Sequence, residues 1–213
     1  MKLTGIRTRS MAIKAHNDAF LAAADIGRVD VVRECLQKKI CDVDMKYNEG
    51  ESALMIAAGK GHKDVVDVLL AHNCELDLQD EEGNNALMWA VRCGHKDIVD
   101  ILVAHNCELD LQDEEGESAL IWAVRYGHKD IVEVLVAHNC NLDLQSYDGF
   151  TALIIAAAYG HKEIVNVLVA HNCKLDLQTK GGETALMRAA GDGHKEIVNA
   201  LSLIHISEPT RPY

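Results

Sequence analysis

Histidine and cysteine are the residues of this 213-residue chain best suited to metal chemistry, and it holds 11 of the first and seven of the second. The tetrapeptide Ala-His-Asn-Cys brings the two types together four times, at Ala71–Cys74, Ala104–Cys107, Ala137–Cys140 and Ala170–Cys173. Zinc needs about four such ligands converging at roughly 2.0–2.3 Å. A metal site would therefore require copies of the tetrapeptide to meet in space.

The spacing of the copies argues against that meeting. They recur every 33 residues, and so does the dipeptide Gly-His, which begins at Gly61, Gly94, Gly127, Gly160 and Gly193. A fixed period of this length indicates a stacked array of similar units. Equivalent residues in neighbouring units then lie about 8–10 Å apart, beyond the reach of shared zinc ligands or of a disulfide. We expect no metal, no cofactor and no disulfide, and interpret the cysteines as buried thiols beside a helix end.

Enzyme chemistry has equally little support. The chain contains no phosphate loop, nucleophile elbow or zincin motif, and its acidic residues recur with the repeat. A lysine starts each second helix, and in three of them, at Lys63, Lys96 and Lys129, an acidic residue follows four positions later (Asp67, Asp100 and Glu133), which is typical of a solvated helix face. The sequence predicts a protein that is not an enzyme.

Charge and composition narrow the class of partner. With 21 Lys and Arg against 33 Asp and Glu, the net charge of −12 argues against binding to a phosphate backbone. No window approaches the roughly 18 uninterrupted apolar residues of a membrane span. The odd number of cysteines, without a secretory pattern, favours free thiols in a reducing cytoplasm. We expect a monomer whose partner is a protein with a basic or apolar contact surface.

Each unit predicts two helices and an extended finger. In the unit that begins at Gly83, Asn85 caps a short first helix that ends near Gly94, and a second helix covers residues 96–103. Asn106 stands where a left-handed residue is needed, and residues 107–115 alternate as in a short extended segment ending in a turn. The equivalent caps are Ser52, Ser118, Thr151 and Thr184.

These features resemble the ankyrin repeat, whose unit is 33 residues of turn, helix, helix and finger. The resemblance implies an all-α fold: an ankyrin-repeat solenoid of stacked helix-turn-helix units with short β-hairpin-like fingers. The family's Thr-Pro-Leu-His box is present as, for example, Asn85-Ala86-Leu87-Met88, and its proline and histidine are missing from every copy. Alanine keeps helix propensity at the position of the proline, while methionine or isoleucine cannot make the hydrogen bonds of the histidine.

The repeats predict the domain organisation. The repeat domain covers residues 17–200, with units at 17–49, 50–82, 83–115, 116–148, 149–181 and 182–200, of which the first is a degenerate cap and the last is incomplete. Residues 1–16 form a basic head, expected to be disordered, in which Met11 is a second candidate start. Residues 201–213 leave the repeat pattern, and Leu201–Arg211 resembles a translated sequencing adapter, so we expect the native chain to continue differently there.

The positions that differ between otherwise similar repeats are the best indication of function. The resemblance implies that the finger tips and the groove side of the first helix form a concave partner surface, where both tryptophans lie. Aromatic residues and arginine are typical of binding hot spots. Packing of the tryptophans into gaps between inner helices is an equally open interpretation. The residues predicted to contact a partner are Glu81, Glu82, Asn84, Trp89, Arg92, Cys93, Glu114, Glu115, Glu117, Trp122, Arg125, Tyr126, Tyr147, Asp148, Phe150 and Tyr159.

Two functions follow from these features. The first is a protein-interaction scaffold that binds its partner through the groove and finger tips. The alternative is the targeting or regulatory region of a longer enzyme, for example a kinase. Because one fold serves unrelated partners, the sequence does not name the partner.

Overall fold

A computed structural model describes residues 16–207 of the chain. These residues divide into two compact units, one ending at Glu108 and the other beginning at Leu109. Most of the predicted basic head, and the end of the adapter-like segment from residue 208, lie outside the described residues.

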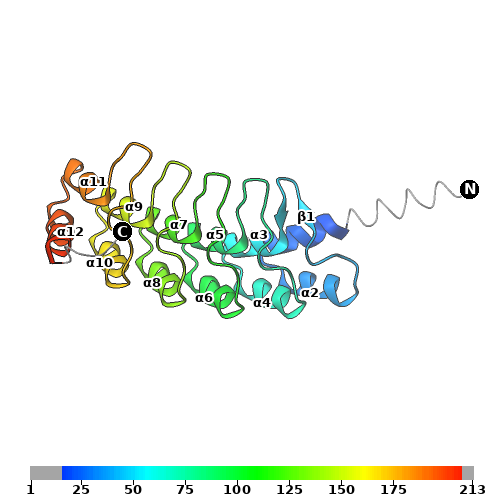
Figure 1. Cartoon of the computed structure of the whole chain (residues 1–213). Helices are drawn as coiled ribbons and strands as arrows, with labels where there is room; N and C mark the ends of the chain where they lie inside the picture. The colour runs from blue at the N-terminus through cyan, green and yellow to red at the C-terminus, as the bar shows by residue number, and fades with distance from the viewer. Residues whose placement is uncertain (1–15, 208–213) are drawn as a thin grey trace, which may run out of the picture. The chain divides into compact units, whose positions relative to one another are not determined.

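The first unit is a stack of helix pairs joined by turns. Its inner helices α3 and α5 pack against each other, and its outer helices α2, α4 and α6 form a second layer behind them (Figure 1). The elements are a helix over 16–25, α2 (Val29–Gln37), β1 (Lys46–Tyr47), β2 (Glu51–Ser52), α3 (Ala53–Lys60), α4 (Lys63–Ala71), α5 (Ala86–Arg92) and α6 (Lys96–Ala104).

The second unit repeats this arrangement, with α9 packed between α7 and α11, and α10 between α8 and α12 (Figure 1). Its last helix continues beyond residue 200, where the repeat pattern is lost, with Leu201 buried and Leu203 exposed. The elements are α7 (Ala119–Arg125), α8 (Lys129–Ala137), α9 (Ala152–Ala158), α10 (Lys162–Ala170), α11 (Ala185–Gly191) and α12 (Lys195–Ser207).

The predicted helix caps are confirmed. The side chain of each capping residue accepts a hydrogen bond from the backbone N–H three residues later, at 2.9 Å for Asn85 and 3.2–3.4 Å for Ser52, Ser118, Thr151 and Thr184. Such a cap pairs an amide that the helix itself leaves unpaired. The inner helices are therefore capped although the box has lost its proline.

Left-handed residues close each second helix, as predicted. Asn106 has a φ of 59°, and Asn73, Asn139 and Asn172 have φ values of 54–62°. Asparagine tolerates this conformation better than other non-glycine residues, because its short side chain bonds locally. The period of the sequence thus places the same backbone turn at the same point of each repeat.

The core is built from small residues on the inner helices and branched residues on the outer ones. Ala57, Ala58 and Ala90 of the inner helices have no exposed surface, as is true of Val99 and Leu102 of α6. Small side chains let neighbouring helices approach closely, since the interaxial distance depends on the residues at the contact. The inner layer therefore packs tightly.

The fingers are less regular than predicted. In residues 16–207, strand pairing is limited to the antiparallel pair of β1 and β2, with Lys46 opposite Ser52, and one bridge between Gln112 and Ser118. Elsewhere the fingers are loops held by side chains. Gln79 and Gln145 each donate to a carbonyl of their own turn, at 2.6 Å to Gly83 and 2.8 Å to Gly149, and Gln145 also donates to Gln178 of the next finger at 3.0 Å.

Candidate functional site

The cysteines and histidines of the tetrapeptides are structural. Cys74, Cys107, Cys140 and Cys173 are buried, and burial raises the pKa of the first three thiols to about 12. The ring Nδ1 of each histidine bonds to the carbonyl oxygen four residues earlier, at 2.8 Å from His72 to Val68 and 2.9 Å in the other copies. No three His, Cys, Asp or Glu side chains between residues 16 and 207 are placed to hold a metal ion.

The histidines of the Gly-His pairs join one repeat to the one before it. Nε2 of His62 bonds to the carbonyl of Asp25 at 2.9 Å, and His95 and His194 make the same contact with Gly59 and Ala158, at 3.1 and 2.9 Å. Nε2 of His161 differs, because it has no hydrogen-bond partner within residues 16–207, and burial lowers the pKa of this histidine. The repeated histidines therefore hold the stack together.

An aspartate in each finger has the same role, which the sequence alone did not reveal. The Oδ1 atom of this residue accepts a hydrogen bond from the first backbone N–H after the next buried cysteine, at 2.7–2.9 Å. The pairs are Asp44 with Glu75, Asp77 with Glu108, Asp110 with Asn141, and Asp143 with Lys174. Four of the acidic residues thus make contacts between repeats.

The helix-surface ion pairs agree with the predicted solvated face. Lys96 pairs with Asp100 at 2.7 Å and Lys129 with Glu133 at 2.6 Å, and all four side chains are a little under half exposed. Exposed pairs of this kind contribute little to stability, typically below about 1 kcal/mol.

Each tryptophan is tied to the finger of the repeat that precedes it in the sequence. In the first unit, Trp89 Nε1 donates to Asp80 Oδ2 at 3.0 Å. The other oxygen of Asp80 accepts from the backbone N–H groups of Glu82 and Asn84, at 3.0 and 2.8 Å. The indole therefore braces the finger turn against the inner helix, and the half-buried ring retains accessible surface.

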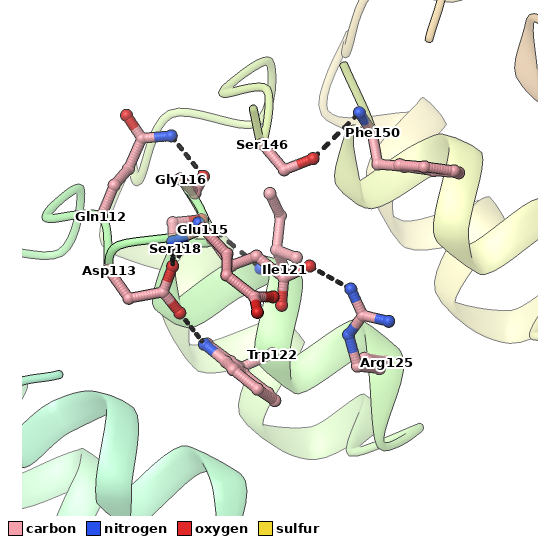
Figure 2. A network of polar contacts seen from close by, with 11 residues as sticks. Gln112, Asp113, Glu115, Gly116, Ser118, Ile121, Trp122, Arg125, Ser146 and Phe150 are labelled. Carbon is pink, nitrogen blue, oxygen red and sulfur yellow. Dashed lines mark hydrogen bonds and ion pairs between the residues drawn. The ribbon is translucent and has the colours of Figure 1, made fainter. Parts of the chain in front are cut away.

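The second unit contains the same arrangement around Trp122, shown in Figure 2. Trp122 Nε1 donates to Asp113 Oδ2 at 2.9 Å, and Asp113 Oδ1 accepts from the backbone of Glu115 and Glu117. Tyr126 stacks on Trp122, with ring centroids 5.8 Å apart and an interplanar angle of 11°. Both interpretations of the tryptophans thus have support: the N–H serves the fold, while the ring lies among variable residues.

The two fingers that precede Ile155 and Arg188 have a hydroxyl in place of this aspartate. Ser146 accepts from the backbone of Phe150 at 3.2 Å (Figure 2), and Thr179 accepts from Glu183 at 3.3 Å. The residues at the tryptophan position are then Ile155 and Arg188. The finger residue is therefore aspartate where the following inner helix has tryptophan. The second oxygen of the carboxylate accepts the hydrogen bond that the indole N–H donates.

Two residues predicted to contact a partner are buried instead. Asn84 is 6% exposed and its amide donates to the Asp80 and Glu82 side chains, while Glu117 is 4% exposed and pairs with Arg125. Burial raises the pKa of Glu117, against the opposing effect of Arg125. These two residues support the surface rather than form it. The predicted contact residues that are exposed are Glu81, Glu82, Arg92, Cys93, Glu114, Glu115, Tyr126, Tyr147, Asp148 and Tyr159.

A pocket of about 500 Å³, which we call the first pocket, lies in the first unit, beside the inner helices. Trp89 and Cys93 line it, as do several residues that the sequence analysis did not select. Its apolar part comprises Leu21, Ala22, Met55, Ile56, Gly59 and Trp89, and its polar part Asp18, Asp25, Tyr47, Asn48, Glu51 and Lys60. Lys60 reaches Asp25 at 3.3 Å.

A pocket of about 340 Å³, the second pocket, lies in the second unit. Its guanidinium groups face aromatic rings: Arg188 lies 5.6 Å from the Phe150 ring centroid and pairs with Glu183 at 2.7 Å, while Arg125 lies 5.8 Å from that of Trp122. The Nε atoms of both arginines are buried and have no partner within residues 16–207. The lining residues are Arg125, Phe150, Ile155, Ala158, Tyr159, Arg188 and Asp192.

The residues missed by the sequence analysis had a detectable signal. Glu51 occupies the repeat position of Asn84, Glu117 and Phe150, which were selected. Asp25 and Gly59 occupy the position of Arg92 and Arg125. The variable positions extend into the first two repeats, where Asp25, Glu51 and Gly59 occupy them. The alignment is harder to see there because the first repeat is degenerate.

Comparison with known families identifies the class of protein. A family model described as "Ankyrin repeats (3 copies)" matches residues 19–113, 102–179 and 120–210, which together span most of the chain. The chain belongs to the ankyrin-repeat family, whose members are in general protein-interaction modules. Comparison with curated protein sequences gives no match.

Within residues 16–207, every helix is too short or too polar to cross a bilayer.

Proposed function

We propose that this chain is a non-catalytic scaffold that binds a partner protein through its inner helices and finger tips. The observation that supports this proposal is that the constant and the variable positions of the repeat make different kinds of contact. Frame residues, such as His95 and Asp77, are engaged in contacts between repeats. The variable positions, by contrast, line a pocket in each unit. A surface that varies on a constant frame is what recognition of a specific partner requires.

The reducing interior of the cell is the compartment we propose for this activity. The seven cysteines form no disulfide with one another within residues 16–207, and Cys93 is the exposed one among them. An exposed thiol persists unpaired only where the redox potential keeps it reduced.

Cys93 also provides the test, because it lines the first pocket and the other thiols are less accessible. A maleimide photo-crosslinker attached to Cys93 of the full chain is expected to capture a discrete partner from a cell extract, identified by mass spectrometry. The matched control is Cys93→Ser with Ala104→Cys, which moves the reactive thiol to an exposed position at the end of outer helix α6. Equal capture of the same proteins from both positions would contradict the proposal.

Replacing both tryptophans with alanine is a less informative test of binding. Trp89→Ala would remove the donor to Asp80 and leave that carboxylate with one fewer hydrogen bond. A loss of binding would then be hard to separate from a change in the finger. Trp89→Phe also loses this donor but keeps an aromatic ring in the pocket, so comparing Trp89→Phe with Trp89→Ala separates the contribution of the ring from that of the N–H.

A further inference from the structure

We propose that the first pocket takes the side chain of an arginine presented by the partner protein. This inference rests on the proposed function and specifies its chemistry. Its basis is the combination, in one cavity, of an apolar and aromatic part with an excess of carboxylates.

The charge of the pocket is the first argument. Asp18, Asp25 and Glu51 contribute three carboxylates, against the single ammonium group of Lys60. Lys60 and Asp25 are about half exposed, so their 3.3 Å contact is a weak, solvent-screened pair. The pocket lining therefore has an excess of negative charge, which a cation from the partner would complement.

The electrostatic state of Glu51 supports this argument. Burial is the largest cause that raises its pKa, followed by the carboxylates of Asp80, Glu49 and Asp25, while Lys60 acts in the opposite direction. The ionised form of Glu51 thus lies in an unfavourable environment in the unliganded protein. A cation in the pocket would relieve the repulsion among these groups.

The shape of the pocket is the second argument. Gly59 lies within helix α3, where glycine costs about 1 kcal/mol relative to alanine. A Cβ at this position would lie 3.5 Å from Trp89 Cε3, so any larger side chain would extend over the pocket. Arg92 and Arg125 occupy the same position in the next two repeats. Glycine here keeps open a space that those repeats fill with their own arginine.

The aromatic part selects arginine over lysine. Arg92 already lies over the Trp89 ring, 5.4 Å from its centroid, which demonstrates that this indole accepts a guanidinium neighbour. A guanidinium group is planar, stacks on aromatic rings and can donate to two carboxylates together. Its methylene stem suits the apolar residues Met55 and Ile56.

Nuclear magnetic resonance of the full chain tests the proposal directly, because its two tryptophans give two indole N–H signals. The probe is acetyl-Gly-Gly-Arg-Gly-Gly-amide, and its control is the same peptide with citrulline, which has nearly the same shape and no charge. The arginine peptide is expected to shift the Trp89 signal in a saturable manner and to leave the Trp122 signal in place. The citrulline peptide is expected to bind at least about tenfold more weakly, which corresponds to a loss of roughly 1.4 kcal/mol in binding free energy.

Variants locate the site. Asp25→Asn with Glu51→Gln is expected to weaken binding of the arginine peptide at least about tenfold, whereas Glu75→Gln, an exposed acid outside the pocket, is expected to leave it unchanged. Gly59→Arg is expected to abolish binding with the fold intact, because repeats 3 and 4 carry arginine at this position. Equal binding of the citrulline peptide, or undiminished binding by Gly59→Arg, would overturn the proposal.

Two further outcomes separate this inference from the proposed function. If Cys93 captures a partner but the arginine peptide leaves Trp89 unmoved, the scaffold function stands and the arginine assignment is overturned. If Arg7→Ala with Arg9→Ala in the full chain by itself shifts the Trp89 signal, the chain's own arginines occupy the pocket, and the assignment to a partner is overturned.

Discussion

The first and second pockets occupy the same positions of the ankyrin repeat and have different chemistry. Both are centred on an isoleucine, Ile56 in one and Ile155 in the other. The other equivalent pairs, first pocket before second, are Asp25 and Arg125, Glu51 and Phe150, Gly59 and Ala158, Lys60 and Tyr159, Trp89 and Arg188, and Cys93 and Asp192.

This difference indicates that one set of residues stabilises the fold and another set determines the chemistry of the pockets. The caps, the left-handed asparagines and the finger aspartates are the same below both pockets, and these contacts hold the repeats together. The pocket positions are therefore free to change from acid to guanidinium. Four substitutions at equivalent positions test this separation.

The largest effect is expected from Glu117→Gln. Glu117 is buried beside Arg125, and removing its charge leaves a guanidinium without its counter-ion. We expect a loss of about 3 kcal/mol in the free energy of unfolding, measured in urea. Glu183→Gln is the control at the same repeat position, where the pair with Arg188 is more exposed and the loss is expected to be below about 1 kcal/mol. Equal losses would show that burial does not distinguish the two pairs.

The next largest effect is expected at the base of the fingers. Asp80→Ala removes the acceptor of three hydrogen bonds below the first pocket, from Trp89, Glu82 and Asn84, and is expected to cost about 2 kcal/mol. Ser146→Ala, at the same repeat position in the second unit, removes one bond and is expected to cost about 1 kcal/mol. Thermal unfolding followed by circular dichroism measures both. A smaller loss for Asp80→Ala than for Ser146→Ala would contradict the role given to the tryptophan brace.

A stabilising effect is expected from Gly59→Ala. The second pocket already has alanine at this position, and the new Cβ would make ordinary contact with Trp89 at 3.5 Å. Higher helix propensity is expected to raise the free energy of unfolding by about 1 kcal/mol, and Ala158→Gly to lower it by a similar amount. Urea denaturation of the two variants provides the measurement. Destabilisation by Gly59→Ala would mean that the first pocket has no room for a side chain.

The smallest effect is expected from Glu51→Gln, and it depends on pH. The pKa of Glu51 is raised in the folded protein, so its contribution to stability is full below the ordinary glutamate pKa of about 4.3 and is lost as pH rises through the raised value. Glutamine does not ionise. The variant is therefore expected to be more stable than the wild type at pH 7 by less than about 1 kcal/mol, with no difference near pH 4. A wild type that is the more stable of the two at pH 7 would show that Glu51 is favourably paired.

Much of the fold could be predicted from the sequence because its determinants are local. A cap such as Asn85 acts on an amide three residues away, and Asn106 acts on its own backbone. The candidate site was less predictable. Glu117 and Phe150 occupy the same repeat position and were predicted as the same kind of contact, yet one is buried beside an arginine and the other lines a pocket. Glu117 pairs with Arg125 of its own repeat, whereas Arg125 and Arg188 of the neighbouring repeats complete the pocket around Phe150.

The sequence by itself determined the repeat, its boundaries, the helix caps and turns, and the positions that vary, since each depends on residues within one period. The tertiary structure decided which varying residues share a pocket and with what charge. The first pocket collects Asp25, Glu51 and Trp89 from three successive repeats. Each repeat alone has only a few such side chains, and their electrostatic and packing effects combine only when the repeats stack.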